Sequence, residues 1–102
     1  MDLNEYQRKS RETAVYQLQP SVDGLTYAVL ALCGEAGELA NKLKKHLRAG
    51  TPPNCEILQD ELGDVLWYVA AVAQELGTDL NQVAFFNLEK LAARKAANKI
   101  TG

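Results

Sequence analysis

The sequence predicts an all-α protein in which four helical segments follow one another and the central two pair as an antiparallel hairpin. Three observations predict this class. Apolar residues recur every three or four positions through the long segments, as they do on the buried face of a helix. Clusters of glycine, proline and helix-capping residues separate the segments. The alternating pattern of a β-strand is absent from the sequence.

The first two helices have clear starts. Asp2 begins the first helix, where Glu5 completes a D-x-x-E capping pattern, and this helix is predicted to fade before Pro20. The second helix is predicted from Asp23–Gly24 to Ala49–Gly50, where the stretch "AGTPPN" ends it.

The last two helices complete the chain. Asn54 offers a cap for the third helix, which is predicted over residues 55–77. Asp79 caps the fourth helix, which is predicted to reach the region of Asn98. Because the chain has 102 residues and no segment that resembles a linker, a single domain spanning residues 1–102 is expected.

The composition and charge of the chain argue against several classes of function. The net charge is −2 and no basic block occurs, which argues against binding to nucleic acid. No apolar run approaches the length of a membrane span, and the polar, acid-bearing N-terminus is unlike a signal peptide. These features predict a cytoplasmic protein without a nucleic-acid or membrane partner. Cys33 and Cys55 have no C-x-x-C spacing, so they are expected to be reduced core residues.

Two matching pairs of acids interrupt the central helices. Glu35 and Glu38 lie in the second helix, and Glu61 and Asp64 lie in the third. At about 100° per residue, each pair falls on the same flank of the apolar stripe of its helix. The stripes consist of Leu25, Val29, Leu32, Ala36, Leu39 and Leu43, and of Leu58, Leu62, Val65, Val69, Val72 and Leu76.

The two acid pairs are expected to meet. A short loop makes the two helices antiparallel neighbours that pack stripe against stripe. The two-fold axis that relates such helices carries equivalent flanks to one face of the hairpin. Counted from the loop, the pairs also sit at a similar depth, about 6 Å apart along the helix axis. The four carboxylates should therefore converge.

Small and aromatic residues border the acids. Gly34, Gly37 and Gly63 remove side chains there, which leaves room for a metal, water and phosphate, or for close helix packing. Trp67 is expected to pack in the core. Tyr68 falls on the acidic flank, from which it could reach a ligand.

Four converging carboxylates favour a bound cation, since like charges otherwise repel. Oxygen ligands without Cys or His favour Mg²⁺ or Mn²⁺ over zinc or iron. Mg²⁺ commonly bridges carboxylates to substrate phosphates, and a water activated beside it can attack phosphorus. The simplest alternative is solvated surface acids, which is the usual meaning of one isolated E-x-x-E pair. A di-iron bundle requires E-x-x-H pairs, which these acids do not form.

Basic and amide residues could supply the phosphate-binding half of such a site. Lys45 lies beyond the acids toward the loop of the hairpin. Lys90 and Arg94 are i,i+4 neighbours on the last helix, and Asn87 precedes Lys90 by one turn. Each of the cations, taken singly, is equally well explained as part of a solvated cationic face.

The sequence around these acidic, basic and amide residues resembles the MazG-like nucleotide pyrophosphohydrolases, the all-α NTP pyrophosphatase superfamily. The resemblance spans nearly the whole chain in family order. It rests on "NEYQ" (4–7), "GEAGELANKLKK" (34–45), "ELGDVLWY" (61–68) and "NLEKLAAR" (87–94).

The resemblance implies hydrolysis of nucleoside triphosphates between the α and β phosphates, which gives a monophosphate and pyrophosphate. In this family an E-x-x-E and an E-x-x-D motif bind Mg²⁺, for which Mn²⁺ can substitute. These motifs map onto Glu35 and Glu38 and onto Glu61 and Asp64. A glutamate of the first motif activates water, so the resemblance implies Glu35 as the catalytic base, with Glu38 second.

The resemblance also implies phosphate contacts from Asn87, Lys90 and Arg94, with Lys45 as a further candidate. Two departures from the family pattern bear on the details. Many relatives begin the first motif with two glutamates, whereas Gly34 precedes Glu35 here. The R-Y-P-x-G-F ending of many relatives is replaced by "KAANKITG", so the last helix is expected to run longer.

An oligomer is expected as well. The family fold implies one, and a single chain of four helices would leave apolar residues of the last helix uncovered. The prediction is therefore a Mg²⁺-dependent (d)NTP pyrophosphohydrolase of four helices that forms a homodimer or homotetramer. A narrow dNTP substrate, such as dUTP or a purine dNTP, and a catalytically silent interaction module are the alternatives. The uncovered residues are Phe85, Phe86, Leu88 and Leu91.

Overall fold

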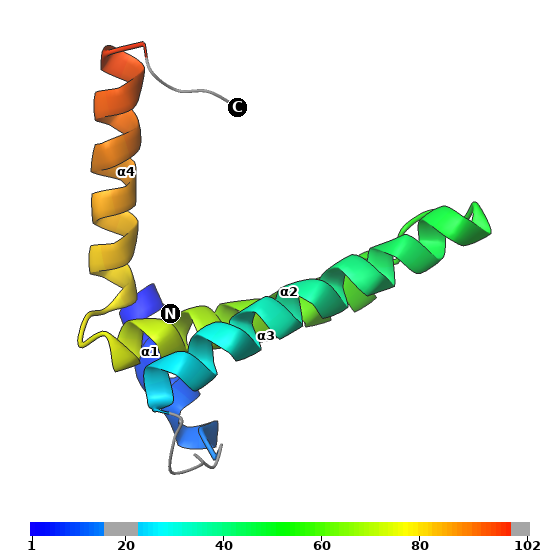
Figure 1. The fold of residues 1–102 in the computed structure, drawn as a ribbon, viewed down its shortest axis with the longest axis horizontal. Helices are drawn as coiled ribbons and strands as arrows, with labels where there is room; N and C mark the ends of the chain where they lie inside the picture. Colours follow the sequence, from blue (N-terminus) through cyan, green and yellow to red (C-terminus); the bar gives the residue numbers. More distant parts are fainter. Residues whose placement is uncertain (16–22, 99–102) are drawn as a thin grey trace.

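The computed structural model describes residues 1–15 and 23–98, and these residues form helices without any strand (Figure 1). The predicted all-α class is confirmed. In chain order the elements are α1 (Leu3–Ser10), the 3₁₀ helix η1 (Arg11–Thr13), α2 (Gly24–Ala49), α3 (Cys55–Glu75) and α4 (Leu80–Ala96).

Side-chain caps begin all four α-helices at the predicted positions. In each cap a carboxylate or amide oxygen accepts a hydrogen bond from an N–H group of the first turn, which the helix itself leaves unpaired. Two glycines with φ angles of 69° and 74° follow α2 and α3 and end them in the left-handed conformation. The capping residues are Asp2, Asp23, Asn54 and Asp79, and the glycines are Gly50 and Gly77.

The first helix is shorter than the sequence predicts. The α-helix ends at Ser10 and is followed by η1, while residues 16–19 of the predicted segment lie outside the described residues. Hydroxyl groups explain this end. Ser10 Oγ donates to the carbonyl of Gln7 (2.8 Å), and Thr13 Oγ1 donates to the carbonyl of Ser10 (3.1 Å). These side chains offer the carbonyls an alternative to further helical hydrogen bonds.

The helices are arranged as a long pair with two shorter attachments. α2 and α3 lie side by side in opposite directions and are joined by residues 50–54 (Figure 1). α1 packs at one end of this pair, where it contacts α3 and α4. α4 leaves the same end at a steep angle and runs away from α2 and α3 (Figure 1). The acid-bearing middle of α2 and α3 is therefore not covered by α4.

The core of one chain is small. Among the described residues, the buried hydrophobic ones are four alanines and one leucine, and no large side chain is completely buried. The expected stripe-to-stripe packing is only partly present, because several stripe residues stay exposed. Burying one large apolar side chain stabilises a fold by about 1.5–3 kcal/mol, so covering this exposed surface would stabilise the protein considerably. The exposed stripe residues are Leu25, Val29, Ala36, Leu43, Leu62 and Leu76.

The two cysteines belong to the exposed surface. Cys33 and Cys55 are free thiols, and both are exposed in the single chain. The prediction that they lie in the core is therefore wrong for one chain taken alone. Both lie in segments whose predicted apolar stripes are themselves incompletely covered.

Gln7 fixes the elbow between α3 and α4. Its side chain is buried, donates to the carbonyl of Thr78 (3.1 Å) and accepts from the backbone N–H of Leu80 (2.8 Å). One turn earlier, Asn4 Oδ1 accepts from the backbone N–H of Asn81 (3.0 Å). Side chains of the "NEYQ" stretch therefore accept hydrogen bonds from the N–H groups of the first turn of α4. These contacts fix the direction of α4 relative to α3.

Gln7→Ala is expected to lower the free energy of unfolding by about 1–3 kcal/mol, because the partly buried carbonyl of Thr78 and the buried N–H of Leu80 both lose their hydrogen bond to Gln7. Urea unfolding followed by circular dichroism measures the change. The control is Arg8→Ala, an exposed neighbour on α1, which should shift stability by no more than about 0.5 kcal/mol. Equal losses in the two variants would contradict the role given to Gln7.

Candidate metal centre

Three carboxylates from two helices converge on one side of the hairpin. Glu35 comes from the middle of α2, and Glu61 and Asp64 come from successive turns of α3. One carboxylate oxygen of each residue lies within 4.8 Å of the other two. Glu35 and Glu61 are partly buried, whereas Asp64 is exposed, so the group is open to solvent. An all-oxygen donor set of this kind fits a hard divalent cation such as Mg²⁺ or Mn²⁺.

The electrostatics of the cluster centre on Glu35. Burial raises the pKa of its carboxyl above the ordinary value, and neighbouring negative charges raise it further. In order of effect, these charges belong to Asp64, Glu61 and Glu38. The ion-free cluster therefore disfavours a charged Glu35. A bound cation would reduce this repulsion.

Glu38 stands apart from the other three predicted ligands. Among the described residues, the group within 4.8 Å contains Glu35, Glu61 and Asp64 only. Glu38 is exposed, although its charge still contributes to the raised pKa of Glu35. Helix geometry explains the difference. Glu35 faces α3, whereas a residue three positions later is rotated by about 60° around α2.

The glycines beside the acids do not serve close packing within the chain. A Cβ atom built on Gly34, Gly37 or Gly63 would meet nothing within 4 Å. Of the two interpretations, close packing of α2 against α3 is therefore wrong. Room for a ligand or for a partner molecule remains as the reason for accepting about 1 kcal/mol per glycine in a helix.

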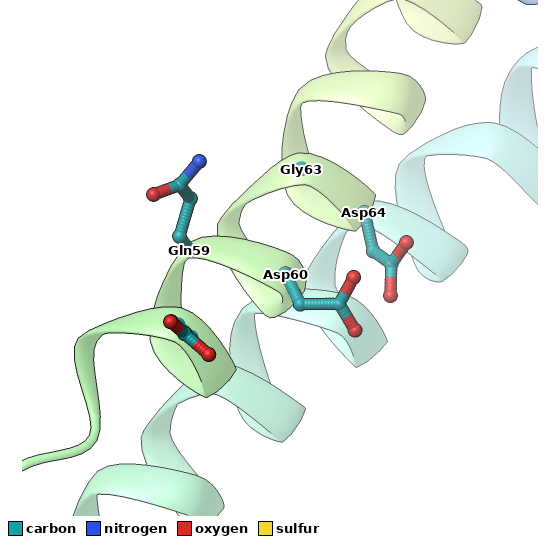
Figure 2. A pocket seen from close by; sticks show the side chains of 5 residues that line it. Gln59, Asp60, Gly63 and Asp64 are labelled. Atoms are coloured by element: carbon teal, nitrogen blue, oxygen red, sulfur yellow. The ribbon is translucent and has the colours of Figure 1, made fainter.

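Asp64 lines two separate pockets. The first has a volume of about 380 Å³ and lies on α3, where Asp60 and Asp64 project to the same side while Gln59 points away (Figure 2). The second has a volume of about 310 Å³ and reaches from the cluster to η1. The first is lined by Glu56, Gln59, Asp60, Gly63 and Asp64, and the second by Thr13, Glu35, Asp64, Trp67 and Tyr68.

Trp67 lines the second pocket and is not a pure core residue, so the expectation of core packing missed this role. Its Nε1–H donates to Thr13 Oγ1 (3.0 Å), and the guanidinium of Arg11 lies over its ring, 4.7 Å from the centroid. Tyr68 meets the Trp67 ring edge to face, with centroids 4.8 Å apart. Because Trp67 follows Asp64 by three residues, helical spacing could have found it. No local sequence pattern around Thr13 or Arg11 indicates that these residues lie beside Trp67.

The predicted phosphate-binding residues do not join the acids within one chain. Lys90 lies about 15 Å along α4 from its start, and Asp64 lies about 16 Å along α3 from its end. Because α4 runs away from α3 at a steep angle (Figure 1), these two positions on the helices lie far apart. Arg94 is one turn further out, and Asn87 lines an apolar pocket at the elbow. Lys45 is exposed on α2.

No helix in the described ranges is long and apolar enough to cross a membrane.

Comparison with known proteins gives two matches. The family model "MazG nucleotide pyrophosphohydrolase domain" matches residues 25–97, which contain all of the acids and all of the cationic candidates described above. The chain is also 44% identical to the Gene 37 protein of Mycobacterium phage L5 over 109 residues, covering 100% of this chain and 96% of that protein. No solved structure matches the chain significantly. On the family match, this chain belongs to the MazG nucleotide pyrophosphohydrolase family.

Proposed function

We propose that this protein is a Mg²⁺-dependent nucleoside triphosphate pyrophosphohydrolase that cleaves (d)NTPs between the α and β phosphates. The products would be a (d)NMP and pyrophosphate, and the cytoplasm is the compartment that such a substrate implies. The observation that carries the proposal is the convergence of three carboxylates within 4.8 Å on the hairpin of a MazG-family chain. Mn²⁺ is expected to substitute for Mg²⁺.

Each acid has a proposed role. Glu61 and Asp64, together with Glu35 and Glu38, would hold the cation. When bound, Mg²⁺ would neutralise phosphate charge and make a neighbouring water more acidic. Glu35 is the group proposed to accept a proton from the attacking water, because it is the acid of the first motif that joins the cluster of carboxylates. Glu38 is the second candidate for this role.

The water oxygen adds to the α-phosphorus in line with the leaving group, and the bond to pyrophosphate breaks. Cationic side chains would neutralise the charge that develops on the phosphates, and an amide side chain would donate hydrogen bonds to them. We assign this task to Asn87, Lys90 and Arg94, with Lys45 as a further contact. The aromatic wall of Trp67 and Tyr68 beside the acids supports binding of a flat base next to the reacting phosphates.

A substrate panel tests the proposal. Purified protein with Mg²⁺ is incubated with each common NTP and dNTP, and the rate of hydrolysis is measured for each nucleotide. Similar rates across the panel support a broad enzyme, whereas turnover of dUTP or one purine dNTP alone supports the narrow alternative. The aromatic wall is the feature that favours some discrimination among bases.

A catalytically silent interaction module is the remaining alternative, and the exposed apolar surface is what favours it. It predicts no turnover of any nucleotide with either Mg²⁺ or Mn²⁺. It also predicts that Mg²⁺ leaves the melting temperature unchanged, since solvated acids would bind no cation tightly.

A further inference from the structure

We infer that Arg11 and Thr13 are positioning residues of the nucleotide site, which hold the ring of Trp67 in one orientation as the wall against which the base of the substrate lies. The part of this inference that concerns the substrate rests on the proposed function. Its structural part rests on two hydrogen bonds and a ring contact that join η1 to α3. Both residues precede residues 25–97, so the family match assigns them no role.

The pocket beside the acids joins η1 to the hairpin. Its volume of about 310 Å³ lies at the lower end of the range of about 300–1,000 Å³ that is usual for small-molecule sites. Glu35 and Asp64 of the acid cluster line it from the hairpin together with Trp67, and Thr13 lines it from η1. A nucleotide that binds with its phosphates at the acids therefore places its base at the aromatic end of this pocket.

The hydroxyl of Thr13 fixes the edge of the Trp67 ring. Its proton is donated to the carbonyl of Ser10 (3.1 Å), so toward other groups Oγ1 acts as an acceptor. Oγ1 accepts a hydrogen bond from the indole Nε1–H of Trp67 (3.0 Å), which can only donate. Because the donor and acceptor roles are both defined, a Trp67 ring that turns over about its χ2 bond loses this hydrogen bond.

The guanidinium of Arg11 fixes the face of the same ring. Its Cζ atom lies 4.7 Å from the centroid of Trp67, a distance at which the face of an indole attracts a cation. Nη2 also donates to the backbone carbonyl of Trp67 (3.4 Å). Nε and Nη2 donate to Ser10 Oγ (3.2 and 3.1 Å), and this hydroxyl donates to the carbonyl of Gln7. Arg11 is therefore held between α1 and α3, which keeps its charge over the ring.

The two contacts matter for binding because they order the wall of the pocket before a ligand arrives. A side chain that is already ordered loses less conformational entropy when the complex forms. Loss of either contact is expected to weaken nucleotide binding by about 5- to 10-fold, which corresponds to the net effect of one hydrogen bond. Because Arg11 and Thr13 act through Trp67, KM should rise more than kcat falls.

Binding of a nucleotide that cannot be hydrolysed tests the inference. The α,β-methylene analogues of the common nucleoside triphosphates are titrated with Mg²⁺ by isothermal calorimetry, and the analogue that binds the wild type most tightly is used for the variants. Thr13→Val and Arg11→Met should each raise its Kd by about 5- to 10-fold. Thr13→Ser, which keeps the hydroxyl, and Arg8→Met, an exposed control on α1, should stay within about 2-fold of the wild type.

Inorganic tripolyphosphate is the matched control ligand, because it carries the phosphates without a base. Its Kd in the presence of Mg²⁺ should be the same in the wild type and in every variant. Weaker binding of tripolyphosphate to Arg11→Met would show that Arg11 contacts phosphate directly. An equal loss of both ligands in Thr13→Val would show a general disturbance of the site. Either result, or unchanged nucleotide binding in Thr13→Val, overturns the inference.

A spectroscopic readout reports on Trp67 without any turnover. Trp67 is the only tryptophan of the chain, so isotope-labelled protein gives a single indole N–H resonance in NMR spectra. The hydrogen bond to Thr13 should slow the exchange of this proton with water, and Thr13→Val should speed the exchange. The nucleotide analogue should shift the resonance. Equal exchange in the wild type and Thr13→Val, or a resonance that does not respond to the analogue, contradicts the inference.

The measurements separate two kinds of failure. Weaker analogue binding in Thr13→Val and Arg11→Met, together with no hydrolysis by the wild type, keeps the positioning role and contradicts the proposed hydrolase function. Hydrolysis by the wild type with an unchanged KM in both variants keeps the hydrolase function and contradicts the positioning role.

Discussion

Replacing Glu35 by glutamine is expected to reduce nucleotide hydrolysis by at least about 100-fold while raising the melting temperature of the ion-free protein at neutral pH. The carboxamide has about the same size as the carboxylate, but it is too weak a base to accept a proton from water. It also lacks the negative charge that attracts a cation. It also removes the charge that burial and the neighbouring carboxylates disfavour, which is why stability should rise. Steady-state rates and thermal unfolding in EDTA measure the two effects.

Two variants provide controls for Glu35→Gln. Glu5→Gln removes a partly buried acid of α1 that pairs with Lys9 (3.1 Å), and it should leave both activity and Mg²⁺ response near those of the wild type. Glu38→Gln should reduce activity less than Glu35→Gln, because Glu38 lies outside the 4.8 Å cluster. Full activity in Glu35→Gln together with loss in Glu38→Gln would reverse the proposed assignment of the base.

The stabilisation by Mg²⁺ should depend steeply on pH. The pKa of Glu35 is raised, first by burial and then by the neighbouring charges, so the folded ion-free protein keeps this proton to a higher pH than the unfolded chain does. The contribution of Glu35 to ion-free stability is therefore fully present below the ordinary carboxyl pKa, about 4.3, and is lost as pH rises through the raised folded value.

Mg²⁺ reverses this trend because it binds the deprotonated cluster. The rise in melting temperature caused by Mg²⁺ is expected to be largest near pH 7 to 8 and to vanish below about pH 4. Thermal unfolding with and without Mg²⁺ across this range measures it, and Glu35→Gln should show a smaller, flatter response. A Mg²⁺ effect that is constant with pH, or largest in acid, would contradict the electrostatic account of the cluster.

Local features of the fold could be predicted from the sequence because their causes are local. The caps at Asp2, Asp23, Asn54 and Asp79 depend on short side chains next to a helical pattern, and the structure has all four. The end of α1 was predicted too late. The hydroxyls of Ser10 and Thr13, which bond nearby carbonyls, look like ordinary helix residues in the sequence.

The part of the candidate site that depends only on which face of a helix carries each acid could be predicted from the sequence. The matching angular positions of the acids on their helices predict that Glu35 lies near Glu61 and Asp64. Whether Glu38 also joins them depends on the rotation of α2 about its own axis relative to α3, which the sequence pattern does not define closely enough. The direction of α4 could not be predicted. It depends on contacts between residues more than seventy positions apart, such as Gln7 with Leu80, and no periodicity encodes them.

The most direct test of the central claim is the identity of the products formed from the best substrate of the panel. Wild-type protein and Asp64→Asn are incubated with that nucleotide and Mg²⁺, and the products are resolved by ion-exchange chromatography. The account predicts equal amounts of nucleoside monophosphate and pyrophosphate from the wild type and neither from Asp64→Asn. Release of diphosphate and orthophosphate, or identical products from both proteins, would contradict it.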